Sequence, residues 1–384
     1  MTTSRQEPPT RADAVLAFVF DNSLLLVIGA LTALIWANLD LEHYSDATHF
    51  LHFAVNDIGM VFFFALAAKE VFEATLPGGP LASPRVAAVP VFAAIGGMIA
   101  PASMYLIAIW LIGRPELHSG WAIPCATDIA FSYLVARVIF KRGHPAIPFL
   151  LLLAIADDAL GLVVLAVFYP SGDVSLPLLA GLLGPALVLA WTLRRFGVES
   201  FWAYVAGPGV LSWFALHWGG LHPALALVPI VPFMPHHDSD LKLFGRRGTA
   251  RLMTMHQFEH WWKIPVQFVL FAFGLVNAGV PLSAVGPITW IIMGSLIVGK
   301  PIGIVGTTAL AELVGFQRSA GLDYRSLVTL GVAAGIGFTV ALFFTTASFP
   351  PGLVLDEAKM GALLSFFASV IAIAVGRGLG IRNK

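Results

Sequence analysis

Charge is scarce in this sequence. Charged side chains make up 11% of the 384 residues, less than half the share that is usual in a soluble domain, while hydrophobic side chains make up 58%. No soluble core could enclose that much apolar surface, so the composition indicates an integral membrane protein in a lipid bilayer. The 22 basic and 22 acidic residues balance to a formal charge of zero, which excludes the basic surface of a nucleic-acid-binding protein.

Cysteine is also nearly absent. Cys125 is the only one, so no disulfide can form within the chain. Residues 1–13 are polar and lack the charged start, short apolar run and small-residue cleavage site of a signal peptide. We expect these residues to remain on the chain as a cytoplasmic tail.

Long uncharged stretches are abundant instead. A membrane-spanning helix needs about 20 mostly apolar residues, and charges and turn residues divide the chain into segments of that kind. The sequence therefore predicts an all-α membrane protein of about twelve transmembrane helices, near residues 14–38, 57–76, 86–112, 121–140, 146–169, 176–193, 199–215, 221–235, 258–278, 286–311, 326–348 and 359–379.

Lysine and arginine predict the orientation of these spans, because cytoplasmic loops carry an excess of them. With the N-terminus inside, the outer loops hold only Arg114 and Lys359. The inner loops hold Arg5, Arg11, Arg85, Arg137, Lys141, Arg142, Arg194, Arg195, Lys242, Arg246, Arg247, Arg251, Lys263, Arg318, Arg325, Arg377, Arg382 and Lys384. This asymmetry predicts an even number of spans, with both termini cytoplasmic. Because no connection is long enough for a second soluble domain, residues 1–384 are predicted to form one membrane domain.

Four ionisable residues are predicted to lie near the centre of the bilayer: Asp128, Asp157, Asp158 and Lys300. A charge at that depth costs about 2.5–3.5 kcal/mol even on a lenient scale, so such residues mark candidate functional sites. Structural ion pairs between helices are the alternative. They do not explain two adjacent aspartates, because one lysine neutralises only one carboxylate.

Asp157 and Asp158 lie about 18 Å from either end of their predicted helix, at 1.5 Å per residue, which is the membrane midplane. Burial and mutual repulsion favour the protonated form of a carboxylate. A small hard cation such as sodium prefers oxygen ligands, and its binding to such a pair is expected to expel protons. Competition of cation and proton for one site is the core of an exchange mechanism.

Two predicted spans contain signals for an interruption at mid-membrane. The fourth reads GWAIPCATDIAF and includes Thr127 and Asp128, and the eleventh reads GVAAGIGFTVALFF and includes Gly335 and Gly337. An ordinary glycine-packed helix is the alternative for the eleventh. Interrupted helices at corresponding places in spans 3–5 and 10–12 form the pattern of inverted-topology repeats. Asp128 and Lys300 have the signs needed to offset the exposed positive and negative helix ends.

These segments resemble the NhaA-type family of sodium/proton antiporters. The similar stretches follow the family's order through spans 2 to 12: VNDIGMVFF (55–63), AAIGGMIAPA (93–102), GWAIPCATDIAF (120–131), AIADDALG (154–161), GKPIGI (299–304) and GIGFT (335–339). The resemblance implies that Asp157 and Asp158 bind Na⁺ and protons and that Lys300 pairs with Asp157. It also implies that Thr127 and Asp128 lie where the interrupted helices cross.

The resemblance further implies pH sensing near a cytoplasmic funnel, where His222 and Glu259 with His260 match the family's segments and Glu73 is a further candidate. A packed, hydrogen-bonded histidine is the alternative for His222. This sequence departs from the family in the second span, where KEVFE (69–73) has Lys69 in place of a glutamate. The segment between spans 1 and 2 is shorter than in relatives that carry a dimerising β-hairpin there. A homodimer formed through that hairpin is therefore not supported.

The sequence thus predicts a secondary active antiporter of the bacterial inner membrane that exports sodium or lithium in exchange for protons, without a cofactor. The predicted ion-binding core spans approximately 86–172 and 285–380, with the other helices as a supporting panel that allows alternating access. A sodium-coupled organic-anion symporter of the same fold, a passive cation channel and an intramembrane aspartyl protease are the alternatives. Such a protease takes its two aspartates from different helices, whereas the central pair here is adjacent.

Overall fold

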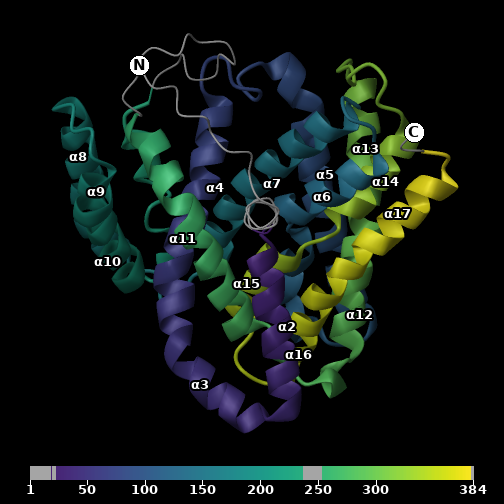
Figure 1. The fold of residues 1–384 in the computed structure, drawn as a ribbon, viewed down its shortest axis with the longest axis horizontal. Coiled ribbons are helices and arrows are strands. Elements are labelled where there is room, and N and C mark those ends of the chain that lie inside the picture. The colour runs from purple at the N-terminus through teal and green to yellow at the C-terminus, as the bar shows by residue number, and fades with distance from the viewer. Residues whose placement is uncertain (1–18, 20–22, 237–252, 382–384) are drawn as a thin grey trace, which may run out of the picture.

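The computed structural model describes residues 19, 23–236 and 253–381, and in these ranges all of the regular secondary structure is helical (Figure 1). The predicted tail 1–13, the last residues and most of the loop at 236–257 lie outside the described residues. Six of the described helices are long and apolar enough to cross a membrane, and two bent helix pairs raise the number to as many as eight. The prediction of an all-α protein with many membrane spans is confirmed at that level.

The helices have the following bounds. The first half contains α2 (Leu24–Leu39), α3 (Leu41–Phe53), α4 (Met60–Thr75), α5 (Pro84–Leu111), α6 (Ile129–Ile139) and α7 (Ala146–Phe168). The second half contains α8 (Leu176–Arg195), α9 (Phe201–Tyr204), α10 (Val210–Gly219), α11 (Thr254–Asn277), α12 (Pro287–Gly294), α13 (Lys300–Leu313), α14 (Tyr324–Ala334), α15 (Phe338–Ser348), α16 (Leu353–Leu364) and α17 (Ala368–Gly378). Short π-helical segments join α3 to α4, α9 to α10 and α12 to α13.

The second predicted span begins earlier than expected. The sequence predicted a start at residue 57, but α3, a π-helical segment and α4 form one apolar helix over Leu41–Thr75. Residues 41–58 contain neither glycine nor proline, so the helix continues through this stretch although it holds several polar side chains. The Tyr44 hydroxyl fixes α3 in place, because it donates to the Leu275 carbonyl at the end of α11 over 2.9 Å.

The predicted helix at 221–235 is wrong. This segment contains only two short 3₁₀ turns, Pro223–Leu225 and Val231–Phe233, joined by further tight turns. Pro223, Pro229, Pro232 and Pro235 explain the difference, because proline has no amide hydrogen to donate and clashes with the preceding helical turn.

Both predicted interruptions are present in the structure. A 3₁₀ helix, Pro115–Cys125, meets α6 at an angle of 55°, and α14 meets α15 at 51°. At the two breaks the Asp128 amide donates to the Ile336 carbonyl over 2.7 Å. The breaks are therefore in direct contact, and each supplies a partner for backbone groups that the other leaves exposed.

Close glycine contacts bring the two halves of the chain together. A Cβ atom at Gly96 of α5 would overlap the Gly303 carbonyl and the Thr307 side chain of α13. These glycines let α5 and α13 approach closely, and they belong to the segments AAIGGMIAPA and GKPIGI. Figure 1 shows α13, α14 and α17 on one side of the molecule and α8, α9 and α10 on the other. The α5–α13 contact fixes the depth at which α13 begins, at Lys300.

Candidate ion-binding site

Lys300 and Asp157 form a buried ion pair. Asp157 lies on α7, and Lys300 is the first residue of α13 after the π-helical segment Ser295–Gly299. The Lys300 Nζ is 3.1 Å from Asp157 Oδ2, and only 1% of Lys300 and 4% of Asp157 are exposed. Lys300 also donates to the Thr127 hydroxyl in the first interruption. The other carboxylate oxygen, Asp157 Oδ1, is buried and has no hydrogen-bond donor among the described residues.

Asp128 lies where the two interrupted helices touch. Its Oδ1 accepts from the Phe131 amide over 3.4 Å and so caps α6. Its Oδ2 accepts from the Thr339 amide over 3.3 Å and from the Thr339 hydroxyl, in the first turn of α15. One carboxylate therefore meets the N-terminal, positive ends of both α6 and α15. Lys300, by contrast, donates to the hydroxyl of Thr127, a side chain at the break.

Gly335 and Gly337 lie on the other side of this contact. A Cβ at Gly335 would lie 2.7 Å from the Leu296 carbonyl, and one at Gly337 would lie 3.1 Å from the Ala126 carbonyl. The Gly337 amide donates to the Ser365 hydroxyl over 3.3 Å. Both glycines therefore permit close backbone approach at the break, which is a sufficient reason for glycine at these positions.

Asp158 borders two cavities. The larger has a volume of about 310 Å³, and its lining includes Asp158, Asp128, Thr339 and Glu70. The smaller, of about 30 Å³, is lined by both adjacent aspartates and otherwise mainly by apolar side chains. Asp158 is the only acidic residue that these two cavities share, so it lies at their boundary.

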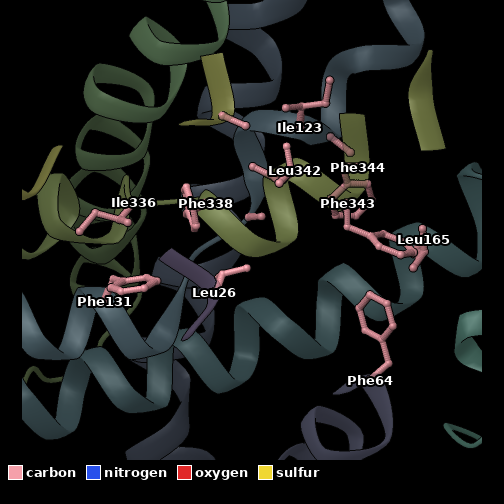
Figure 2. Close-up of a cluster of buried hydrophobic side chains, with 14 of the residues drawn as sticks. Leu26, Phe64, Ile123, Phe131, Leu165, Ile336, Phe338, Leu342, Phe343 and Phe344 are labelled. Atoms are coloured by element: carbon pink, nitrogen blue, oxygen red, sulfur yellow. The ribbon is translucent and has the colours of Figure 1, made fainter. Parts of the chain in front are cut away.

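Aromatic and aliphatic side chains line the smaller cavity. Phe64, Leu165, Phe343 and Phe344 all line it. Figure 2 shows Phe343 beside Leu165, with Phe64 approaching from another helix, and the rings of Phe64 and Phe343 meet edge to face with centroids 5.0 Å apart. We call these four residues the apolar seal. Asp158 therefore borders the larger cavity, whereas Asp157 lines only the smaller one, beside the apolar seal.

A second ionic cluster ties α4 to α11. The buried Lys69 Nζ is 2.6 Å from Glu73 Oε2 and 2.6 Å from Glu259 Oε2. His260 is exposed on α11. His222 lies apart from this cluster, because its ring packs against Phe343 of the apolar seal at a centroid distance of 4.8 Å. The structure thus brings together two of the four candidate pH-sensing residues.

Two residues at the site were not singled out from the sequence. Thr339 donates to Asp128 across 211 positions of chain, a contact that no local pattern predicts. Its place in the segment GIGFT was the available signal. Glu70 lines the larger cavity, whereas the sequence directed attention to its neighbour Lys69. The helical turn directs adjacent side chains about 100° apart, so Glu70 faces the cavity while Lys69 faces α11.

A family model described as "Na+/H+ antiporter 1" matches residues 14–377. The chain belongs to this Na⁺/H⁺ antiporter family. The Na⁺/H⁺ antiporter NhaA 2 of Pelobacter propionicus is 45% identical over 371 residues, which cover 94% of this chain and 97% of that protein. NhaA of Geotalea uraniireducens is 46% identical over 372 residues, 94% of this chain and 96% of that one. The NhaA resemblance is therefore confirmed, and the chain is an antiporter and not an enzyme.

A solved structure shares the fold of this antiporter family member. The sodium proton antiporter MjNhaP1 of Methanocaldococcus jannaschii matches with a TM-score of 0.58, covering 95% of this chain and 94% of that one. The identity is only 16%, so this match supports the helical architecture alone.

Proposed function

We propose that this Na⁺/H⁺ antiporter exchanges sodium, or lithium, for protons at Asp158 and Asp157 by alternating access in the bacterial inner membrane. The observation that carries the proposal is the position of Asp158 at the boundary between the larger cavity and the smaller, mainly apolar one. Next to it, the Asp157–Lys300 pair is buried, and one carboxylate oxygen of Asp157 has no donor among the residues that the structure describes. Na⁺ prefers such oxygen ligands, and its arrival favours loss of bound protons.

The proposed topology has twelve passes with both termini in the cytoplasm. Four further passes add to the eight candidate spans: α2, α9 together with α10, the turns at 221–235, and α11. The eighth pass consists of the short 3₁₀ turns and further tight turns at 221–235, and none of these residues is exposed, as irregular backbone at membrane depth requires. Residues 86–172 and 285–380 form the ion-binding core, whose matching interruptions support inverted repeats. The remaining helices form the panel.

In the proposed cycle, the larger cavity opens to the cytoplasm. Its lining includes Tyr133 of α6 and Leu151 of α7, and the loop that connects these two helices is predicted to be cytoplasmic. Na⁺ enters, binds Asp158 and displaces its proton. Binding also draws on the free oxygen of Asp157 and breaks its pair with Lys300. The core then shifts against the panel, the apolar seal opens, and Na⁺ leaves outside in exchange for protons.

Charge counting supports electrogenic exchange. Asp158 alone would trade one proton for one Na⁺. The Asp157–Lys300 pair supplies a second proton carrier, because the proton that leaves on Na⁺ binding can come from either partner. More protons than sodium ions then cross in each cycle, so the membrane potential can drive sodium export.

Regulation by pH is proposed for the cluster around Lys69, where Glu73 and Glu259 converge. His260 is exposed near it, and His222 would act separately through its packing on Phe343. For a homodimer, the helical state of Leu41–Phe53 argues against a β-hairpin contact at this place in the chain.

The test uses purified protein in liposomes with an internal pH dye. Sodium or lithium pulses should drive proton movement, and potassium should not. Uptake of labelled organic acids driven by sodium, without proton movement, would instead favour the symporter. Cation flux without coupled protons would indicate a channel.

A further inference from the structure

Two polar residues of the panel stand out in the wall of the larger cavity. Ser23 at the start of α2 and Gln267 on α11 both line it, beside apolar neighbours such as Val266 and Leu270. Gln267 Nε2 donates to Ser23 Oγ over 3.4 Å, so the two side chains form one polar unit. We call it the Ser23–Gln267 pair.

Gln267 has an unused oxygen. The residue is 9% exposed, and its Oε1 has no hydrogen-bond donor among the residues that the structure describes. An enclosed carbonyl oxygen without a partner is destabilising, and native structures rarely keep one without a reason. A leucine would fill this position on α11 without leaving a polar atom unpaired. The presence of an amide therefore indicates that its oxygen binds a ligand.

Ser23 supports the same conclusion independently. It occupies the N-cap position of α2, where a serine hydroxyl usually accepts from the first helical amides, yet its side chain caps nothing. Its backbone is left-handed, with φ 51°, the one such case for a non-glycine residue within the described ranges. Backbone strain of this kind clusters at functional sites. In this case the Ser23 hydroxyl accepts from Gln267 and does not cap the start of α2.

We propose that the Ser23–Gln267 pair is a transient Na⁺ site on the cytoplasmic side of Asp158. The cavity of about 310 Å³ admits a cation together with several waters. The Gln267 carbonyl and Ser23 hydroxyl replace part of the hydration shell, and the carboxylates of Glu70, Asp128 and Asp158 in the same cavity favour a cation over an anion. The inference rests on the proposed function, since it assigns the path by which Na⁺ reaches Asp158.

The location of the pair gives it a specific role. Ser23 and Gln267 belong to α2 and α11, which pack closely through Gly29 and Gly274, whereas Asp158 belongs to α7 of the core. When the core shifts against the panel, the pair stays behind and loses contact with the cation path. It therefore acts on cytoplasmic entry and release, and it does not contribute to the central site itself.

The test compares the two faces of the membrane in Gln267→Leu. Everted vesicles deliver Na⁺ to the cytoplasmic cavity, and right-side-out vesicles deliver it to the external face. We expect the cytoplasmic KM for Na⁺ to rise about threefold to tenfold, the effect of one lost polar contact, with Vmax retained. From outside, KM stays unchanged and Vmax falls by the same factor, because Na⁺ then leaves through the altered cavity and microscopic reversibility links the two directions.

Three further variants make the result decisive. Gln267→Glu keeps the oxygen ligands and should return the cytoplasmic KM to the wild-type value or below it. Ser23→Ala should raise that KM in the same direction as Gln267→Leu. Gln317→Leu, the same substitution at an exposed loop residue, should change neither constant.

The possible failures can be told apart. An equal rise of KM from both faces would place Gln267 in the central site and overturn the inference, as would unchanged kinetics in Gln267→Leu. A wild-type protein without Na⁺-dependent proton flux would overturn the proposed function as well. A loss of thermal stability without the difference between faces would reduce Gln267 to a structural residue.

Discussion

Asp128→Asn tests whether the charge at the crossing, and not merely a hydrogen-bond acceptor, holds the two interrupted helices. Asparagine caps helices about as well as aspartate, so capping by itself predicts little change. Asp128, however, accepts from donors on two helices, the amides of Phe131 and Thr339. Asparagine offers one acceptor and one donor group, so one of these amides would face an NH₂ group.

The magnitude follows from that geometry. An orphaned buried donor costs about 1–3 kcal/mol. Loss of the negative charge at the two helix ends adds about 1 kcal/mol in total. A combined loss of about 3 kcal/mol in a chain of 384 residues corresponds to a fall in Tm of about 4 °C, at about 0.8 kcal/mol/K of unfolding entropy.

The assay pairs thermal unfolding in detergent with Na⁺-dependent proton flux in liposomes. Asp128→Asn should lower the Tm and also raise the apparent KM for Na⁺, because the crossing positions Thr127 beside Lys300. The control is Asp323→Asn, which alters an exposed cap of α14 that accepts from the Ser326 amide over 2.8 Å. It should change neither quantity. Wild-type Tm and wild-type KM in Asp128→Asn would refute this account.

Three other expectations follow from the same geometry. Asp158→Asn should abolish exchange while the protein still inserts and folds, and flux near the wild-type rate would remove Asp158 from the site. An imposed potassium/valinomycin potential should speed or slow sodium-driven proton flux according to its sign. A flux that does not change with the potential would indicate one-for-one exchange, in which the Asp157–Lys300 pair carries no proton. Lys69→Met should lower stability by about 1–2 kcal/mol, since it removes the ammonium group that Glu73 and Glu259 share at a partly exposed site, and an unchanged Tm would show that the cluster does not link α4 to α11.

The interruptions and the central charges could be predicted because each has a strong local cause. Proline and clustered glycines disfavour a continuous helix, and a carboxylate at mid-membrane is too costly to retain without use. The sequence therefore pointed to Asp128 and Asp158 before any contact was known. Family resemblance then supplied the pairing of Lys300 with Asp157, which lies 143 positions away.

Other features depend on tertiary contacts that local patterns do not encode. The extension of the second span through α3 depends on Tyr44 reaching the end of α11. The failure of a helix at 221–235 was foreseeable from its four prolines, but its strong hydrophobicity favoured a helical interpretation. Glu70 and Gln267 were missed because their significance comes from the cavity wall that Ser23 builds together with α4, α6, α7, α11 and α15.

The apolar seal has a consequence for cellular energy. A bacterium stores energy as a proton gradient, and any continuous chain of water through an antiporter would short-circuit it. Beside the aspartates the space of about 30 Å³ holds about two water molecules, and Phe343 and Leu165 are among the residues that line it. Figure 2 shows these two side chains next to each other. Apolar side chains have no group that can accept a proton, so a few such residues are enough to prevent a proton leak between transport cycles.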